Sequence, residues 1–196
     1  PHANNFSGLL GMPSWGVTTT ASSAAGRPNA AVGALPIIFN QQAFDANGTG
    51  PDSIVTYSEP DSGSNDIPWG ADHFNWTMYC NNCNADSNSV DALINQGGQA
   101  TVVTLDDHIS PLNAGSHATL YSDLSNWIGG EFPVPIVDNS GNMVGWAMFH
   151  LTGSVGGSTK QISGYFVSPI NPASMTVVPN VDAGGDFGAY YVALTN

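Results

Sequence analysis

An Asp-Asp-His run is the first part of this sequence whose side chains could do chemistry. Asp106, Asp107 and His108 follow an expected strand, and His117 lies nine positions further on. Two carboxylates beside an imidazole could bind a metal ion or serve a hydrolase as a general base. A turn explains the same residues, with one aspartate closing the chain reversal and His108 in solvent. Because adjacent strand residues point to opposite faces, we favour the turn and expect no catalytic residues and no enzymatic activity.

The two cysteines form the motif Cys80-Asn-Asn-Cys83. In a reducing compartment such a pair can be a redox centre or half of a zinc site. His73 precedes the motif by seven positions and would make a partial zinc site with it, but no fourth ligand can be identified. A second cysteine pair is absent from the sequence, so we expect a local disulfide that fixes a tight loop.

Several loops are rich in side-chain oxygens of the kind that calcium prefers. Asp45, Asn47 and Thr49 stand at alternate positions, and Asp86 and Asp91 belong to a second loop of this composition. The run at 45–49 lacks the terminal glutamate and the flanking helices of an EF-hand. Asx residues that hydrogen-bond their own backbone in turns explain the same pattern, and we favour that interpretation. The sequence thus predicts no cofactor, with weak extracellular calcium binding as the alternative.

The five tryptophans raise the question of carbohydrate binding, because sugars stack on aromatic faces. Trp69 and Trp76 flank an Asp/His/Asn segment and are the best candidates for such a platform. Trp127 and Trp146 lie in patterns typical of a helix face and an apolar strand, so we expect them in the core.

Three asparagines match the N-glycosylation acceptor pattern: Asn5, Asn47 and Asn75. In a chain this rich in Asn, Ser and Thr, such matches also arise by chance. They indicate glycosylation only if the source has the machinery for it.

The charge balance excludes several classes of partner. The chain has 196 residues, with 15 acidic residues against two basic ones and a formal net charge of −13. So few cations cannot neutralise a phosphate backbone or dock on an anionic lipid surface, which excludes nucleic-acid binding and disfavours membranes. Apolar residues make up 41% of the chain, enough for a core, but the longest apolar stretches fall far short of the roughly 20 residues that a membrane helix needs. This polar, weakly charged composition suits an extracellular or cell-surface protein.

The order of apolar segments predicts a mainly β fold, a β-sandwich or barrel-like single domain with about two short helices. Helical spacing with a following Gly-Gly pair predicts helices at 89–96 and 116–128, and residues 45–52 are expected as an acidic loop. We divide the chain into an N-terminal strand or edge segment at 1–26 and a single β-rich domain at 27–196. The predicted strands are 16–22, 34–39, 54–57, 74–79, 100–105, 134–137, 143–152, 161–167, 175–178 and 187–194.

Several blocks of the sequence carry a family resemblance. Residues 100–109 read Ala-Thr-Val-Val-Thr-Leu-Asp-Asp-His-Ile, and later blocks read Phe-Pro-Val-Pro-Ile-Val-Asp, Val-Gly-Trp-Ala-Met-Phe-His-Leu-Thr-Gly and Ile-Ser-Gly-Tyr-Phe-Val. Together with 9–39 and 184–194, this order resembles the extracytoplasmic region of TadE/TadG-like (Tad, tight adherence) pilus-assembly proteins. The resemblance covers most of the chain, but its blocks are mainly hydrophobic and glycine positions.

The resemblance implies an envelope or surface protein linked to pili, adhesion or secretion, and it implies no catalytic residues. Asp106 and Asp107 stand where the family is expected to have Gly-Asp. The chain begins at Pro1 without a methionine or a signal-peptide pattern, so we expect a processed piece whose export signal or anchor lay upstream. This chain itself is not expected to insert into a membrane.

Our leading hypothesis is therefore a non-enzymatic structural domain that acts by protein-protein contacts through β-strand pairing, by self-assembly or with pilus and envelope components. Residues 1–23 are a candidate strand for addition to a neighbour. The alternatives are a secreted calcium- or carbohydrate-binding module and a hydrolase that uses Asp106, Asp107 and His108. Because the net charge is −13, assembly is expected to require calcium, raised salt or lowered pH.

Overall fold

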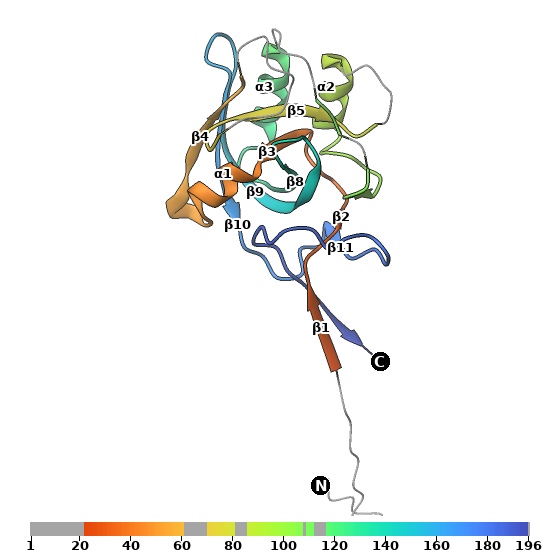
Figure 1. Cartoon of the computed structure of the whole chain (residues 1–196). Helices are drawn as coiled ribbons and strands as arrows, with labels where there is room; N and C mark the ends of the chain where they lie inside the picture. The colour runs from red at the N-terminus through yellow and green to blue at the C-terminus, as the bar shows by residue number, and fades with distance from the viewer. Residues whose placement is uncertain (1–21, 61–69, 81–85, 108, 112–116, 196) are drawn as a thin grey trace, which may run out of the picture.

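The computed structural model describes residues 22–60, 70–80, 86–107, 109–111 and 117–195 of the chain (Figure 1). Strands dominate this part, so the predicted mainly β single-domain class is confirmed. The helical elements of the described part are α1 (Gln41–Asn47), α2 (Ser87–Asn95) and α3 (Ala118–Leu124), with 3-10 turns η2 (Pro51–Ser53) and η3 (Ser125–Trp127). Its strands are β1 (Ser22–Gly26), β2 (Ala30–Ala31), β3 (Ile37–Asn40), β4 (Val55–Ser58), β5 (Phe74–Met78), β6 (Val103–Thr104), β7 (Ser110–Pro111), β8 (Glu131–Val137), β9 (Met143–Val155), β10 (Gln161–Val167), β11 (Met175–Thr176) and β12 (Tyr191–Thr195).

Seven strands form one sheet that curls into a half-barrel (Figure 1). Their order is β4-β10-β9-β8-β3-β5-β7, and all neighbours are antiparallel except β3 and β8. The curl brings β4 back towards β5, because Ser58 forms a bridge with His73 and its N–H donates to the Asp72 carbonyl over 2.8 Å. Of the two architectures expected from the sequence, the barrel-like one is therefore observed.

Aromatic side chains fill the inside of the curled sheet. Phe39, Tyr57, Phe149 and Phe166 are buried, and the centroids of their rings lie 4.9 to 6.2 Å apart. Tilted and edge-on contacts of this kind are favoured by the ring quadrupoles. Because side chains alternate along a strand, Trp146 of β9 belongs to a second apolar cluster, apart from the one that contains Phe149. Its burial agrees with its predicted place in the core.

The two predicted helices, α2 and α3, pack against each other beside β5 (Figure 1). Asp86 caps the start of α2, where its carboxylate accepts a hydrogen bond from the Ser89 N–H over 2.9 Å. The helix buries Val90 and Ile94, and Leu93, the third apolar residue of this spacing, is half-buried. It ends before Gly97, whose positive φ of 83° suits a residue without a Cβ.

Helix α1 was not predicted from the sequence, since residues 45–52 were expected to form a loop. The helix begins after Asn40, whose side chain accepts a hydrogen bond from the Gln42 N–H over 2.9 Å. It has seven residues and buries only Ala43, so it carries no clear apolar period. The expectation of a loop was wrong for residues 45–47, because a short helix with one buried residue leaves too little pattern in the sequence.

A small sheet with the order β11-β2-β6 lies between the half-barrel and the last part of the chain. Asn29, which is 1% exposed, joins the sheet to the C-terminal segment. Its amide donates to the carbonyls of Val178 and Val181, each over 2.9 Å, and its carbonyl accepts from the Val178 N–H over 2.7 Å. These three hydrogen bonds satisfy the polar atoms of the buried Asn29 side chain. They also hold the segment that follows β11 in place.

Strands β1 and β12 pair only with each other and form a two-stranded ribbon that extends away from the rest of the molecule (Figure 1). The ribbon brings the two ends of the described chain together. Ser22 and Ser23, the last residues of the segment considered for strand addition, pair within the chain with Thr195 and Leu194. Residues 1–21 lie outside the described part.

Most predicted strands are confirmed, although their ends shift. The prediction for 161–167 coincides with β10, whereas the strand expected at 100–105 is reduced to β6 and the one expected at 16–22 lies almost wholly outside the described residues. Within the described ranges, none of the helices has the length and apolar character needed to cross a membrane.

Candidate functional site

The described surface is hollowed by two adjoining pockets of about 560 and 440 Å³. Both are lined by Leu105, Asp106 and Met143, so they form one continuous groove. Five aspartates from separate parts of the chain line it, and we call it the acidic groove. They are Asp45, Asp106, Asp107, Asp182 and Asp186.

One wall of the acidic groove is the turn that follows β6. The carboxylate of Asp107 accepts hydrogen bonds from the Thr104 N–H over 2.6 Å and from the Thr104 hydroxyl over 3.0 Å. Asp107 therefore closes the turn, the structural role that the sequence favoured for one of these aspartates. Asp106, the next residue towards β6, lines both pockets. His108, the third member of the run, lies outside the described residues.

The opposite side of the groove is built from α1 and the hairpin between β8 and β9. The buried Asn40 joins the two, since it caps α1 and its amide donates to the Asn139 side chain over 2.9 Å. In the hairpin, Asp138 accepts hydrogen bonds from the N–H groups of Ser140 and Asn142, over 2.8 and 2.9 Å. This fixed turn borders the larger pocket, and α1 places Asp45 at the smaller one.

The segment before β12 completes the smaller pocket through unusually close packing on glycines. A Cβ atom on Gly145 would lie 2.4 Å from the Phe187 ring, and one on Gly184 would lie 2.7 Å from a methyl group of Leu105. Only glycine permits these approaches. The tight fit of this segment against β9 and the β6 turn brings Asp182 and Asp186 to the groove.

Asp186 is the groove aspartate with a clearly shifted pKa. The Tyr190 hydroxyl donates to its carboxylate over 2.7 Å and lowers its pKa, and the Gly188 N–H and the nearby charge of Arg27 act in the same direction. Asp186 is therefore ionised at neutral pH. In turn, the hydrogen bond to this carboxylate raises the pKa of Tyr190. Arg27 also donates to the Gly184 carbonyl over 3.1 Å, so one of the two cations of the chain lies at the base of the ribbon beside the groove.

The predicted calcium residues are placed in several elements. Asp45 and Asn47 lie in α1, Thr49 forms a bridge with Phe166 of β10, Asp86 caps α2 and Asp91 lies within α2. Within the ranges that the structure describes, no three His, Cys, Asp or Glu side chains come close enough together to hold a metal ion. The geometry of these residues therefore gives calcium binding no support.

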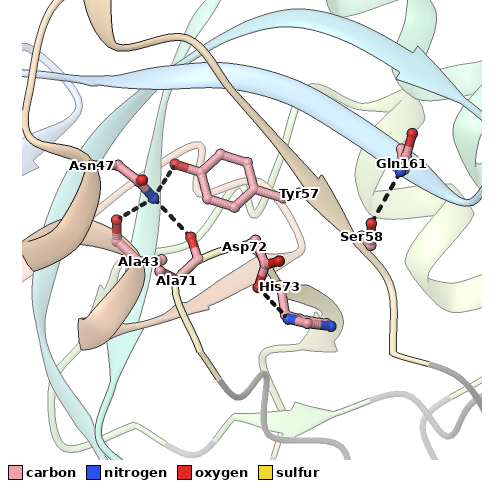
Figure 2. Close-up of polar contacts among 8 residues, drawn as sticks. All are labelled: Ala43, Asn47, Tyr57, Ser58, Ala71, Asp72, His73 and Gln161. Carbon is pink, nitrogen blue, oxygen red and sulfur yellow. Dashed lines mark hydrogen bonds and ion pairs between the residues drawn. The ribbon is translucent and has the colours of Figure 1, made fainter.

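Asn47 has a structural task at the seam where the curled sheet approaches itself (Figure 2). Its amide donates to the Ala43 carbonyl over 2.8 Å and to the Ala71 carbonyl over 2.7 Å, and it lies 3.5 Å from the Tyr57 hydroxyl. Burial raises the pKa of Tyr57 to about 12, although the hydrogen bond from Asn47 lowers it. Because its amide donates to the carbonyls of both Ala43 and Ala71, Asn47 ties α1 to the segment that leads into β5.

The same view shows two further contacts of the seam (Figure 2). Gln161 of β10 donates to the Ser58 hydroxyl over 3.2 Å, and His73 Nδ1 lies 2.8 Å from a carboxylate oxygen of Asp72. His73, considered as a zinc ligand beside the cysteines, is thus paired with a neighbouring carboxylate.

Trp76 is fully buried and lies in a polar cluster inside the core. Its indole N–H donates to Glu59 over 3.2 Å, and the Tyr121 hydroxyl donates to the same carboxylate oxygen over 2.5 Å. His117 Nε2 lies 3.6 Å from the other oxygen of Glu59. A ring with no exposed surface cannot stack on a sugar, so the structure places Trp76 in the core instead of on a carbohydrate-binding surface. Trp69, its proposed companion, lies outside the described residues.

Of the remaining predicted residues, Asn75 is 4% exposed, so in the folded chain its side chain is closed to glycosylation. Asn5 lies outside the described residues. Cys80 lines the larger pocket, but Cys83 also lies outside them, and the disulfide stays a prediction.

Three of these residues were not predicted from the sequence: Glu59, Asp182 and Asp186. Glu59 gives no signal because a single glutamate after a short strand looks like any surface residue. Asp182 and Asp186 enclose the run Ala-Gly-Gly, and such a glycine pair can indicate a close approach of two backbones. No pattern indicates which backbone is approached.

Comparison of the chain with protein-family models, with curated proteins and with solved structures finds no match. The relationship to Tad-type proteins therefore stays a prediction from sequence.

Proposed function

We propose that this chain is a non-enzymatic extracellular or cell-surface structural domain that acts by contacts with other protein chains. The single observation that carries the proposal is the β1–β12 ribbon, which stands apart from the half-barrel (Figure 1). The likeness of the sequence to Tad-type proteins suggests a pilus, filament or adhesive layer as the setting.

The ribbon offers what strand pairing requires. Each of its strands has one neighbour, so its outer edge presents backbone N–H and C=O groups that no other strand of the described chain occupies. Proteins that add a strand to a partner use main-chain hydrogen bonds at such an edge for affinity. All five residues of β1 are exposed, so the backbone there is accessible to a second chain.

The β1 edge in particular is unblocked, whereas on the β12 edge the Val192 N–H donates to the Asn171 side chain. Neither strand contains a proline, a lysine or a carboxylate, although the whole chain has a net charge of −13. Two such acidic chains repel each other least where charge is absent. The distribution of charge therefore favours the ribbon as the contact surface.

Light scattering of the purified chain at high concentration, with calcium and raised salt present, tests this function. We expect oligomers, and we expect hydrogen exchange of the amides in Ser22–Gly26 to be slower in the oligomer than in the monomer. A chain that stays monomeric under all these conditions, or that forms oligomers without protecting the ribbon, would contradict the proposal.

The acidic groove favours a second candidate function, a secreted module that binds a hydroxyl-rich or cationic ligand. Its carboxylates could accept hydrogen bonds from sugar hydroxyls, and Asp45 and Asp106 lie together in the smaller pocket. Calorimetry with calcium and with a panel of glycans tests it, using Asp106→Asn as the variant. Heat of binding that the variant abolishes would support this function, and the absence of heat with every ligand would remove it.

A further inference from the structure

We propose that one face of the β1–β12 ribbon packs against the same face of a second copy of this chain, about a two-fold axis perpendicular to the strands. The face, which we call the aliphatic face, consists of Ser23, Ala25, Val192 and Leu194. This inference rests on the proposed function and names the partner and the geometry of the contact.

The register of the ribbon defines the aliphatic face. Ser23 pairs with Leu194 and Ala25 pairs with Val192. Residues paired directly across two strands point to the same side, and their neighbours in sequence point to the other. The opposite face therefore carries Ser22, Ala24 and Gly26 of β1, with Tyr191 and Ala193 of β12.

β1 is exposed on both faces, but in β12 the aliphatic face is the more exposed one. Leu194 is 80% exposed and Val192 is 37% exposed, whereas Tyr191 and Ala193 on the opposite face of β12 are half-buried. Large aliphatic side chains on a projecting ribbon gain by being removed from water, and a two-stranded ribbon alone is marginally stable. A second ribbon packed on this face would remove these side chains from water and would stabilise the first ribbon.

Charge and shape select a second copy as the occupant. The ribbon carries no carboxylate or basic side chain, so it offers nothing to attract a basic partner, and such a partner would bind the acidic groove instead. A two-fold axis that lies between the two ribbons, perpendicular to the strands, sets Leu194 of each ribbon against Val192 of the other. It likewise sets Ser23 of each ribbon against Ala25 of the other. The contact is then self-complementary, as a two-fold interface must be.

This arrangement also keeps the acidic bodies apart. The ribbon extends from one end of the molecule (Figure 1), so two ribbons that overlap in opposite directions leave the half-barrels at opposite ends. Each chain has a net charge of −13, so the electrostatic repulsion is smallest when the two half-barrels are as far apart as possible. On the β12 edge the Val192 N–H donates to the Asn171 side chain. Stacking uses one face only, so the outer edge of β1 in each ribbon remains available for strand addition.

Two adjacent alanines give a matched test of the aliphatic face. Ala25→Asp and Ala24→Asp add the same charge at exposed positions of β1, on opposite faces of the ribbon. We expect the unaltered chain and Ala24→Asp to form dimers in raised salt, as measured by light scattering over a concentration series. Ala25→Asp should weaken dimerisation about tenfold or more, because the new carboxylates would be buried against an aliphatic layer. Leu194→Ser should weaken it as well.

The outcomes separate this inference from the proposed function. Oligomers that both aspartate variants leave intact, or weaken equally, would overturn the aliphatic face as the contact and leave strand pairing at the ribbon edges standing. A wild-type chain that is monomeric in every condition would overturn both. If Ala25→Asp lowers the thermal midpoint of a monomer and Ala24→Asp does not, the face is covered by this chain's own residues, and the second copy is excluded.

Discussion

At the scale of single residues, the half-barrel depends on a few buried polar side chains with specific partners. The clearest case is Glu59, whose side chain is only 1% exposed. Burial of a carboxylate costs free energy unless hydrogen-bond donors inside the core replace the water that it loses. Trp76 and Tyr121 supply two hydrogen bonds to one of its oxygens, and His117 lies beside the other. Burial, and then the bond to Glu59, raise the pKa of Tyr121, so its hydroxyl remains a donor at ordinary pH. The cluster joins β4, β5 and α3.

Removal of this carboxylate should be costly. Glu59→Ala leaves the Trp76 and Tyr121 donors without their acceptor in the core, and we expect it to lower the free energy of unfolding by about 3 kcal/mol. Urea unfolding measures the change. Tyr121→Phe removes one donor and leaves the other, so it should cost roughly 1.5 kcal/mol. Equal, small losses for both variants would show that the buried carboxylate is not the centre of the cluster.

Asn29 makes a second test at this scale. Asn29→Ala removes three hydrogen bonds to the backbone of residues 178–181, and we expect the free energy of unfolding to fall by about 2 kcal/mol. Asn29→Asp keeps an acceptor for the Val178 N–H and loses the two donors, so its loss should be similar or larger. A variant with an unchanged urea midpoint would contradict the role assigned to Asn29.

At the scale of elements, the sequence predicted local structure well and long-range arrangement poorly. The ends of β10 were predicted correctly, because Gln161–Val167 is rich in residues that favour strands and is bounded by turn residues. The parallel pairing of β3 with β8 could not be predicted, since it depends on how the whole sheet curls. For the same reason, Asp45 and Asp106 were identified separately, and only the fold shows that they line one groove.

Arg27 should control the attachment of the ribbon. It lies one residue after β1 and donates to the Gly184 carbonyl, next to Asp186. We expect Arg27→Ala to raise the hydrogen-exchange rates of β1 and β12 about two- to fivefold, the effect of a hydrogen bond worth somewhat under 1 kcal/mol at an exposed position. The half-barrel should exchange as before. Lys160→Asn removes the same charge elsewhere, at a residue with a φ of 47° that asparagine tolerates, and should leave the ribbon unchanged.

The contact between α2 and α3 should depend on pH. Asp123 raises the pKa of Asp91 through a side-chain hydrogen bond, and the pKa of Asp123 is lowered in turn, so in acid the pair takes up a first proton that the two carboxyls share. A pKa raised by folding gives stability that is complete below the pKa of the unfolded chain and is lost as the pH rises through the folded value.

Asp91→Asn replaces that shared proton with an amide donor. We expect it to raise the free energy of unfolding at pH 7 by about 0.3 kcal/mol, a small value because water screens this pair, and to give no gain near pH 3. Asp86→Asn is the control, since it makes the same change in charge on the same helix. The Ser89 N–H lowers the pKa of Asp86, so its contribution has the opposite sign: it is present above the unfolded pKa and is lost as the pH falls. Thermal unfolding from pH 3 to pH 7 should separate the two variants.

At the scale of the whole molecule, the charge of −13 sets the conditions for assembly. The strands that form the ribbon are uncharged, whereas the acidic groove concentrates carboxylates on the half-barrel. When two chains associate through their ribbons, the electrostatic repulsion that they must overcome is therefore between the two half-barrels, because the contact itself is uncharged. Repulsion of this kind is screened by salt, with a Debye length of about 30 Å at 0.01 M and about 10 Å at 0.1 M.

We expect association to strengthen about tenfold or more between 0.01 and 0.5 M sodium chloride, and to strengthen again as the pH falls towards the sequence pI of about 4.1. Sedimentation or light scattering over a concentration series measures this. Sodium and magnesium at equal ionic strength should act alike if screening is the cause. Calcium that acts at far lower concentration than magnesium would instead indicate a specific site, and would favour the acidic groove over simple screening. Oligomers that persist unchanged in low salt with a chelator would contradict the expected dependence on charge, because two bodies of this net charge would then associate without any screening of their repulsion.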